Sequence, residues 1–143
     1  QDAIRLLQKS DICSLNDEEI AALTGIRNDV RTAMQLLFSW GLKVVNVTMG
    51  KTGQWISDGK TLVKTVPPKI VVNDTTGAGD ATMGGMIYGI LQKKGLQETA
   101  IIATSLSAME IQGSGVRVGL PHKYSELQAF IDSHQFNQET IPF

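Results

Sequence analysis

The stretch NDTTGAGD at residues 73–80 decides the fold that this sequence predicts. It follows the apolar run IVV at 70–72, which predicts a strand. It precedes apolar residues at positions 83, 86, 87, 90 and 91, which predict one face of a helix from Gly79 to about Lys94. A glycine-rich turn between a strand and a helix presents free backbone N–H groups to an anion. Asp80 would lie beside that anion, where its carboxylate can accept a proton from an attacking hydroxyl.

The residues of this turn can also be explained by a structural role alone. Glycine-rich turns also serve only to reverse the chain, and an acidic residue in the first turn stabilises any helix. The Gly-x-Gly pattern alone would favour that interpretation. The longer string DTTGAGDATMGG at 74–85, however, resembles without a gap the C-terminal motif of the PfkB family of carbohydrate kinases, the ribokinase-like sugar and nucleoside kinases.

This resemblance implies ATP as the phosphoryl donor and assigns roles to the residues of the turn. Asp80 would be the general base that activates a substrate hydroxyl. The backbone N–H groups would form an anion hole for the transferred phosphate, contributed by Gly77, Ala78, Gly79 and Asp80.

A second segment follows the predicted strand at 11–15. Asn16 and the acidic residues after it form a good helix start, and Gly25 forms a good helix end. Helix capping would explain these residues without any function. The pattern Asn16-x-x-Glu19 also resembles the Asn-x-x-Glu motif of the same family, which implies that the two side chains help to position Mg²⁺ and the phosphates, largely through water.

A third segment, TMGKTG at 48–53, follows the predicted strand at 42–47. Its GKT is typical of the end of a phosphate-binding P-loop. That motif needs a glycine five residues before Gly50, where this chain has Val45, so we reject a P-loop. The spacing of Thr48, Gly50 and Gly53 instead resembles the family's Thr-x-Gly-x-x-Gly segment, which implies contact with the phosphates and ribose of ATP. A simple glycine turn into the next hairpin is compatible with the same residues.

A monovalent-cation site, with K⁺ as the expected ion, is also implied by the resemblance. Its ligands would be the carboxylate of Asp74 and the backbone carbonyls of Thr76, Glu110, Gly113 and Gly115. Gly119 stands where the family often has a serine, which leaves the dependence on K⁺ open.

Composition excludes several classes of function. The chain has 143 residues, 42% hydrophobic and 19% charged, with a net charge of −1, so nothing indicates binding to nucleic acid or to a membrane surface. Its single cysteine, Cys13, cannot form an internal disulfide, and no window approaches the roughly 18 apolar residues of a transmembrane helix. We therefore expect a cytoplasmic protein without a signal peptide. His122 and His134 lack partners at ligand spacing and are expected at the surface.

Strands and helices alternate along the sequence, which favours an α/β fold. Helices are predicted at 2–9, 17–24, 29–40, 79–94, 97–111 and 125–133, and a hairpin is predicted around Asp58-Gly59. The resemblance specifies the C-terminal part of the three-layer, Rossmann-like ribokinase fold, with a mostly parallel sheet and helices on both faces. The three motif segments all follow strands, so we expect them to meet at one edge of the sheet.

The sequence therefore predicts that residues 1–143 form the C-terminal ATP-binding and catalytic part of a kinase. The reaction would be ATP- and Mg²⁺-dependent phosphorylation of a hydroxyl on a sugar or nucleoside, with ribose, fructose derivatives and nucleosides all open as substrates. The family's N-terminal substrate-binding part has no counterpart here, so the chain alone should be poorly active. A homodimer of the complete protein is left open. The alternatives are a nucleotide-binding or regulatory module without catalysis, and a purely structural half.

Overall fold

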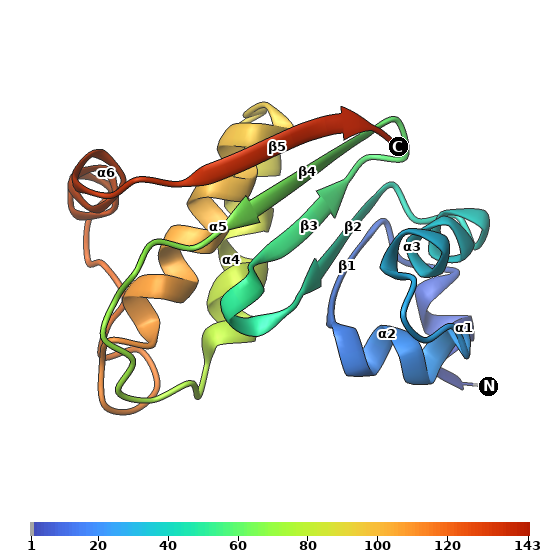
Figure 1. Ribbon diagram of the computed structural model, residues 1–143, viewed down its shortest axis with the longest axis horizontal. Coiled ribbons are helices and arrows are strands. Elements are labelled where there is room, and N and C mark those ends of the chain that lie inside the picture. Colours follow the sequence, from blue (N-terminus) through green and yellow to red (C-terminus); the bar gives the residue numbers. More distant parts are fainter. Residues whose placement is uncertain (1) are drawn as a thin grey trace.

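The computed structural model describes residues 2–143, which fold around a mixed five-stranded sheet in the order β1-β2-β3-β4-β5 (Figure 1). The strands are β1 (Ile12–Asn16), β2 (Val44–Thr48), β3 (Gln54–Ser57), β4 (Thr61–Val66) and β5 (Asn137–Pro142). Only β1 and β2 are parallel, and the three other pairings are antiparallel. The predicted α/β class is confirmed. The sheet is mixed rather than mostly parallel because short connections join β2, β3 and β4, and short connections permit only antiparallel neighbours.

Helices α1 (Asp2–Leu7), α2 (Asp17–Thr24) and α3 (Val30–Ser39) lie together beside β1 and β2 (Figure 1). Met34 and Leu37 of α3 are fully buried against Val45 and Val47 of β2. Cys13 of β1 belongs to the same core, and burial raises the pKa of its thiol to about 11. This thiol is a packing residue, because a nucleophilic cysteine needs a lowered pKa.

The opposite face of the sheet is covered by α4 (Ala78–Leu91) and α5 (Leu96–Glu110). Met86 of α4 and Ala103 of α5 pack against Ile56 and Val63 of the sheet. The two helices lie close together because Gly85 has no side chain. A Cβ on Gly85 would lie 2.7 Å from the Cα of Ala103. Helices on both faces complete the predicted three layers.

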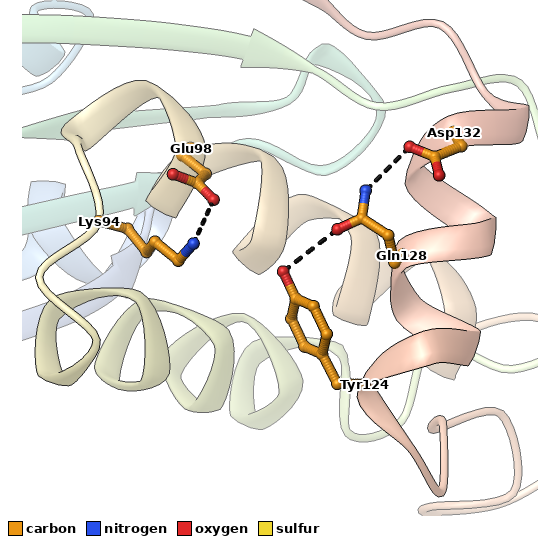
Figure 2. Close-up of polar contacts among 5 residues, drawn as sticks. All are labelled: Lys94, Glu98, Tyr124, Gln128 and Asp132. Carbon is orange, nitrogen blue, oxygen red and sulfur yellow. Dashed lines mark hydrogen bonds and ion pairs between the residues drawn. The ribbon is translucent and has the colours of Figure 1, made fainter.

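The last helix, α6 (Tyr124–Ser133), and the strand β5 close the chain. Figure 2 shows a row of polar side chains along α6, in which Tyr124 donates to Gln128 (3.2 Å) and Gln128 donates to Asp132 (2.8 Å). The sequence did not predict β5. Its residues, NQETIP, lack the apolar pattern of a strand because β5 pairs with β4 at the edge of the sheet and is largely exposed.

One local prediction is wrong in the structure, and a second is shifted by one residue. The run 70–72 forms no strand and has no strand neighbour among residues 2–143, although its apolar residues suggested one; the side chain of Val71 is 74% exposed. The hairpin between β3 and β4 is present, but Ser57 pairs with Leu62, so its central residues are Gly59 and Lys60 rather than Asp58 and Gly59. None of the helices in the described part of the chain has the length and apolar character needed to cross a membrane.

Candidate functional site

A cavity of about 1040 Å³ opens where the carboxyl end of β2 meets the start of α4. Its walls come from the short 3₁₀ helix η1 (Gly50–Thr52), the segment after β4, the first turns of α4, the second half of α5 and the segment between α6 and β5. Its volume suits a ligand of nucleotide size. Polar groups and cations lining it include Thr48, Lys51, Gln54, Lys69, Thr75, Thr82, Thr104, Ser107, His134 and Asn137.

The turn before α4 presents unpaired backbone donors to this cavity. Gly77 is the N-cap, in the left-handed conformation (φ 86°), and Gly79 lines the cavity. The Ala78 N–H reaches the Thr75 carbonyl at 3.3 Å, whereas the N–H groups of Gly79 and Asp80 have no acceptor among residues 2–143. A Cβ on Gly79 would meet nothing within 4 Å. Protein packing therefore does not require glycine at position 79, and its bare backbone leaves room for an anion at the N-terminus of the helix.

Asp80 lies in the first turn of α4, one residue beyond Gly79. It is exposed, and its carboxylate forms no hydrogen bond or ion pair within the described residues. Asp80 is not among the residues that line the cavity. A free carboxylate beside the unpaired N–H groups is available to accept a proton.

The segment from Thr48 to Gly53 forms another part of the cavity wall. Thr48, Gly50 and Gly53 all line the cavity, as does Lys51 between them. Gly53 also has a packing role, because a Cβ there would lie 2.0 Å from the Thr65 carbonyl oxygen. Gly50 has no such neighbour, but its left-handed backbone (φ 54°) favours glycine at that position.

Asn16 and Glu19 lie one strand away from this wall, since Asn16 pairs with Thr48 across β1 and β2. Their side chains form a capping box at the start of α2. Glu19 N–H donates to Asn16 Oδ1 (2.7 Å), and Asn16 N–H donates to Glu19 Oε2 (2.8 Å). Neither residue lines the cavity. The helix-capping role of these two residues is thus present in the structure. The second carboxylate oxygen, Glu19 Oε1, takes no part in the capping box.

The residues predicted for a monovalent cation come together where the loop 111–119, between α5 and α6, meets the turn before α4. The N–H groups of Asn73 and Asp74 both donate to the Ile111 carbonyl. Asp74 Oδ1 accepts the Thr76 N–H at 2.9 Å. Hydrogen bonds from Thr76, backbone first and then side chain, lower the pKa of Asp74, and the backbone of Gly115 adds a weaker contribution.

One carbonyl of this predicted set already has a hydrogen-bond partner. The Glu110 carbonyl accepts the Gly113 N–H at 3.0 Å, so only its second lone pair is available to an ion. Packing requires glycine at position 119, because a Cβ there would lie 2.0 Å from the Met109 carbonyl oxygen. No cluster of three or more His, Cys, Asp or Glu side chains suited to a metal ion occurs between residues 2 and 143.

Several cavity residues were not identified from the sequence. Lys51 and Lys69 line the cavity and form no ion pair in the described part of the chain. His134, expected at the surface, is half-buried, lines the cavity and stacks on Phe130 with ring centroids 4.0 Å apart. Thr104 is buried, and its hydroxyl has no partner among these residues. Only the small-residue pattern of the predicted helix 97–111 pointed toward this part of the site.

Comparison with protein families gives a match to the pfkB family carbohydrate kinase over residues 1–123. An uncharacterized sugar kinase from Archaeoglobus fulgidus is 36% identical over 120 residues, which are 84% of this chain and 47% of that protein. The 1-phosphofructokinase of Escherichia coli K12 is 32% identical over 111 residues, 76% of this chain and 35% of the enzyme.

Among solved structures, Arabidopsis thaliana ribokinase complexed with ribose and ATP superposes with a TM-score of 0.81 at 25% identity, covering 90% of this chain and 43% of that one. The chain thus spans less than half the length of each of these relatives. The fold expected from the turn at 73–80 is confirmed by this likeness.

Proposed function

The chain belongs to the pfkB family of carbohydrate kinases, and on that basis we propose that it is the ATP-binding and catalytic part of an enzyme that phosphorylates a hydroxyl group of a sugar or nucleoside. The observation that carries this proposal is the turn before α4. The unpaired N–H groups of Gly79 and Asp80 stand at the edge of a nucleotide-sized cavity, with a free carboxylate beside them. Phosphoryl transfer depends mainly on positioning and on neutralising phosphate charge.

The chemical step follows from these positions. The triphosphate lies in the cavity with its terminal phosphate at the N-terminus of α4. Asp80 accepts the proton of the substrate hydroxyl as its oxygen attacks the γ-phosphorus, and the bond to the β-phosphate oxygen breaks to release ADP. The N–H groups of Gly79 and Asp80, with those of Gly77 and Ala78, donate to the oxygens of the transferred group.

The rest of the cavity supplies binding energy. Lys51 and Lys69, which line the cavity, bring positive charge to the phosphates. Thr48 and Gly50 lie against the phosphates and ribose. The wall of α5, with Thr104 and Ser107, borders the base, and the unpaired Thr104 hydroxyl offers it a hydrogen bond.

The ions have proposed positions as well. When bound, Mg²⁺ neutralises phosphate charge, and Asn16 and Glu19 would hold it through water, using the oxygen of Glu19 outside the capping box. A monovalent cation would be held where Asp74 and the carbonyls of Thr76, Glu110, Gly113 and Gly115 approach one another. Such a cation would fix the loop 111–119 against the turn.

Several surface features support a complete protein of the relatives' length, in which a further part of the chain packs against residues 2–143. Within residues 2–143, the outer edge of β1 has no strand partner. Large apolar side chains are also left exposed, including Val71 and Leu91 at 74% and 72%. A substrate-binding part of the chain would cover such surfaces and exclude water from the reaction.

The test is the variant Asp80→Asn in the complete protein, assayed with Mg-ATP against a panel of sugars and nucleosides. Loss of the base should lower turnover by roughly 10²- to 10⁴-fold while the affinity for Mg-ATP is retained. Asp11→Asn is the matched control, because Asp11 is an exposed carboxylate before the opposite end of β1, paired with Lys43. Turnover of Asp80→Asn close to that of the wild type would rule out Asp80 as the base.

A nucleotide-binding module without catalysis is the second candidate. One observation favours it: the side chains of Asn16 and Glu19 are engaged in helix capping and do not line the cavity. This candidate predicts that the wild-type protein binds Mg-ATP but phosphorylates no member of the panel.

A further inference from the structure

Glu110, the last residue of α5, carries a carboxylate that the proposed reaction does not use. The residue is only 2% exposed. Its Oε1 accepts the N–H of Arg117 at 2.6 Å, and its Oε2 is buried without a hydrogen-bond partner among the described residues. A buried carboxylate with so few partners is costly, so the surroundings must compensate for it.

The same carboxylate lies directly against the turn before α4. A Cβ built on Gly77 would be 2.7 Å from Glu110 Oε1. Gly77 is therefore restricted to glycine by two independent causes, which are its left-handed backbone and the approach of this oxygen. Glu110 thus contacts the residue that sets the direction of the first N–H groups of α4.

Electrostatics favour this contact. A carboxylate at the C-terminal end of its own helix is unfavourable, because the carbonyl end of α5 carries partial negative charge. The N-terminal end of α4, beside Gly77, carries partial positive charge and stabilises the same carboxylate. The side chain of Glu110 therefore lies between the C-terminal end of α5 and the N-terminal end of α4.

On its other side, Glu110 holds the loop 111–119. Arg117 adopts a left-handed conformation (φ 72°), which is uncommon for a residue with a side chain, and its N–H donates to Glu110. Two residues earlier, the backbone of Gly115 contributes to the lowered pKa of Asp74. The Glu110 carboxylate thus holds the loop through Arg117, and the Asp74 N–H donates to the Ile111 carbonyl at the start of the same loop (3.2 Å).

We propose that Glu110 is a positioning residue, whose carboxylate joins the phosphate-binding turn (residues 75–80) to the loop 111–119 and keeps both in the conformation needed to bind phosphate. It does not touch the reacting atoms. Its consequence for nucleotide binding rests on the function proposed above, whereas the link between turn and loop can be measured without any ligand.

The experiment is residue-resolved amide hydrogen exchange in the complete protein, without nucleotide, for the wild type, Glu110→Ala and Glu110→Gln. Exchange at Arg117 should be roughly tenfold or more faster in Glu110→Ala, because a hydrogen bond to a charged group is lost. The amides of Ala78 and Ala81, which donate to Thr75 and Gly77, should also exchange faster. Glu110→Gln keeps an oxygen acceptor of the same reach and should restore protection at all three amides.

Glu98→Ala is the matched control, since Glu98 lies in the first turn of the same helix and pairs with Lys94 at 2.8 Å on the surface (Figure 2). It should leave the three amides unchanged. If Glu110→Ala does not fold, Glu110→Asp serves in its place, because a carboxylate one methylene shorter cannot reach both Arg117 and Gly77. The proposal would be overturned if the Arg117 amide of the folded variant exchanged at the wild-type rate, or if the amides of Ala78 and Ala81 both did.

A second measurement separates this proposal from the proposed function. Mg-ATP should bind several-fold more weakly to Glu110→Ala than to the wild type, and Glu110→Gln should bind it at least as well as the wild type, because it removes a negative charge near the phosphates. A wild-type protein that binds no Mg-ATP would refute the proposed function, and the exchange rates of the ligand-free variants would still decide the role of Glu110. Equal affinities of the wild type and Glu110→Ala would refute the effect on binding.

Discussion

At the scale of single residues, the turn before α4 has glycine at positions 77 and 79 for different reasons. Gly77 is required by the fold, since its backbone is left-handed and Glu110 lies against it. Gly79 has an ordinary helical position with open space around it, so its missing side chain benefits only a ligand. This difference separates residues that hold the site from residues that face the phosphate.

Gly79→Ala should therefore impair binding without harming the fold. The added methyl group would occupy the space in which a phosphate approaches the N–H groups, so Mg-ATP should bind roughly tenfold or more weakly. Stability should stay the same or rise by up to about 1 kcal/mol, since alanine is the better helix former. Calorimetric titration and thermal unfolding of the complete protein measure the two effects.

Gly84→Ala is the control for this prediction. It lies in the same helix with nothing within 4 Å of an added Cβ, and it does not line the cavity. It should match Gly79→Ala in stability and the wild type in affinity. Equal affinities for the Gly79→Ala and Gly84→Ala variants would show that the bare backbone at position 79 has no role in binding.

At the scale of elements, the pair α4 and α5 positions most of the site. The start of α4 supplies the anion-binding turn, and α5 supplies both a cavity wall and Glu110. Close packing fixes the two helices relative to each other, because a Cβ on Gly85 would collide with the Ala103 backbone and one on Gly89 would lie 2.6 Å from Thr99 Oγ1.

Gly85→Val should consequently destabilise the protein. The obstacle is the Ala103 Cα at 2.7 Å, a backbone atom that cannot rotate away. We expect a loss of about 1–3 kcal/mol in the free energy of unfolding, measured by denaturant titration. Gly84→Val introduces the same side chain one residue earlier into open space and should leave stability unchanged or raise it by up to about 0.5 kcal/mol, because valine is a better helix former than glycine. Equal losses in the two variants would mean that the helix contact does not limit stability.

The elements also show what the sequence could and could not reveal. Apolar periodicity predicted helices such as α3, because α3 buries one face against the sheet. It failed for β5 and for the run 70–72 for opposite reasons. The edge strand β5 needs no apolar pattern once it pairs with β4, and the apolar run 70–72 has no strand beside it among the described residues. Periodicity measures burial and does not identify a pairing partner.

For the site, the sequence identified most residues of the glycine-rich turns, although it missed Lys51, and it missed the residues brought in from a distance. Thr48, Gly50, Gly53 and Gly79 line the cavity as a local motif would require. Lys69 and His134 reach it only through the folding of segments after β4 and α6, which carry no motif. The roles of Asp80, Asn16 and Glu19 stay predictions, and the variants above test the first of them.

At the scale of the whole molecule, the site forms at one end of the sheet, where the carboxyl ends of β1 and β2 lie side by side. Asn16 and Thr48 are paired there, and the turn before α4 borders the cavity of which Thr48 forms a wall. This is the edge at which α/β proteins bind their ligands. A chain that covers less than half of its relatives therefore still assembles one continuous cavity from distant segments.

The central claim is that this cavity binds a nucleotide through its phosphates at the start of α4. Calorimetric titration of the complete protein with Mg-ATP and then with AMP tests it most directly, because the two ligands share a base and ribose and differ in the phosphates that the turn would hold. We expect saturable binding of Mg-ATP and binding of AMP that is weaker by roughly tenfold or more. Equal affinities for the two nucleotides, or no binding of Mg-ATP to a folded sample, would contradict it.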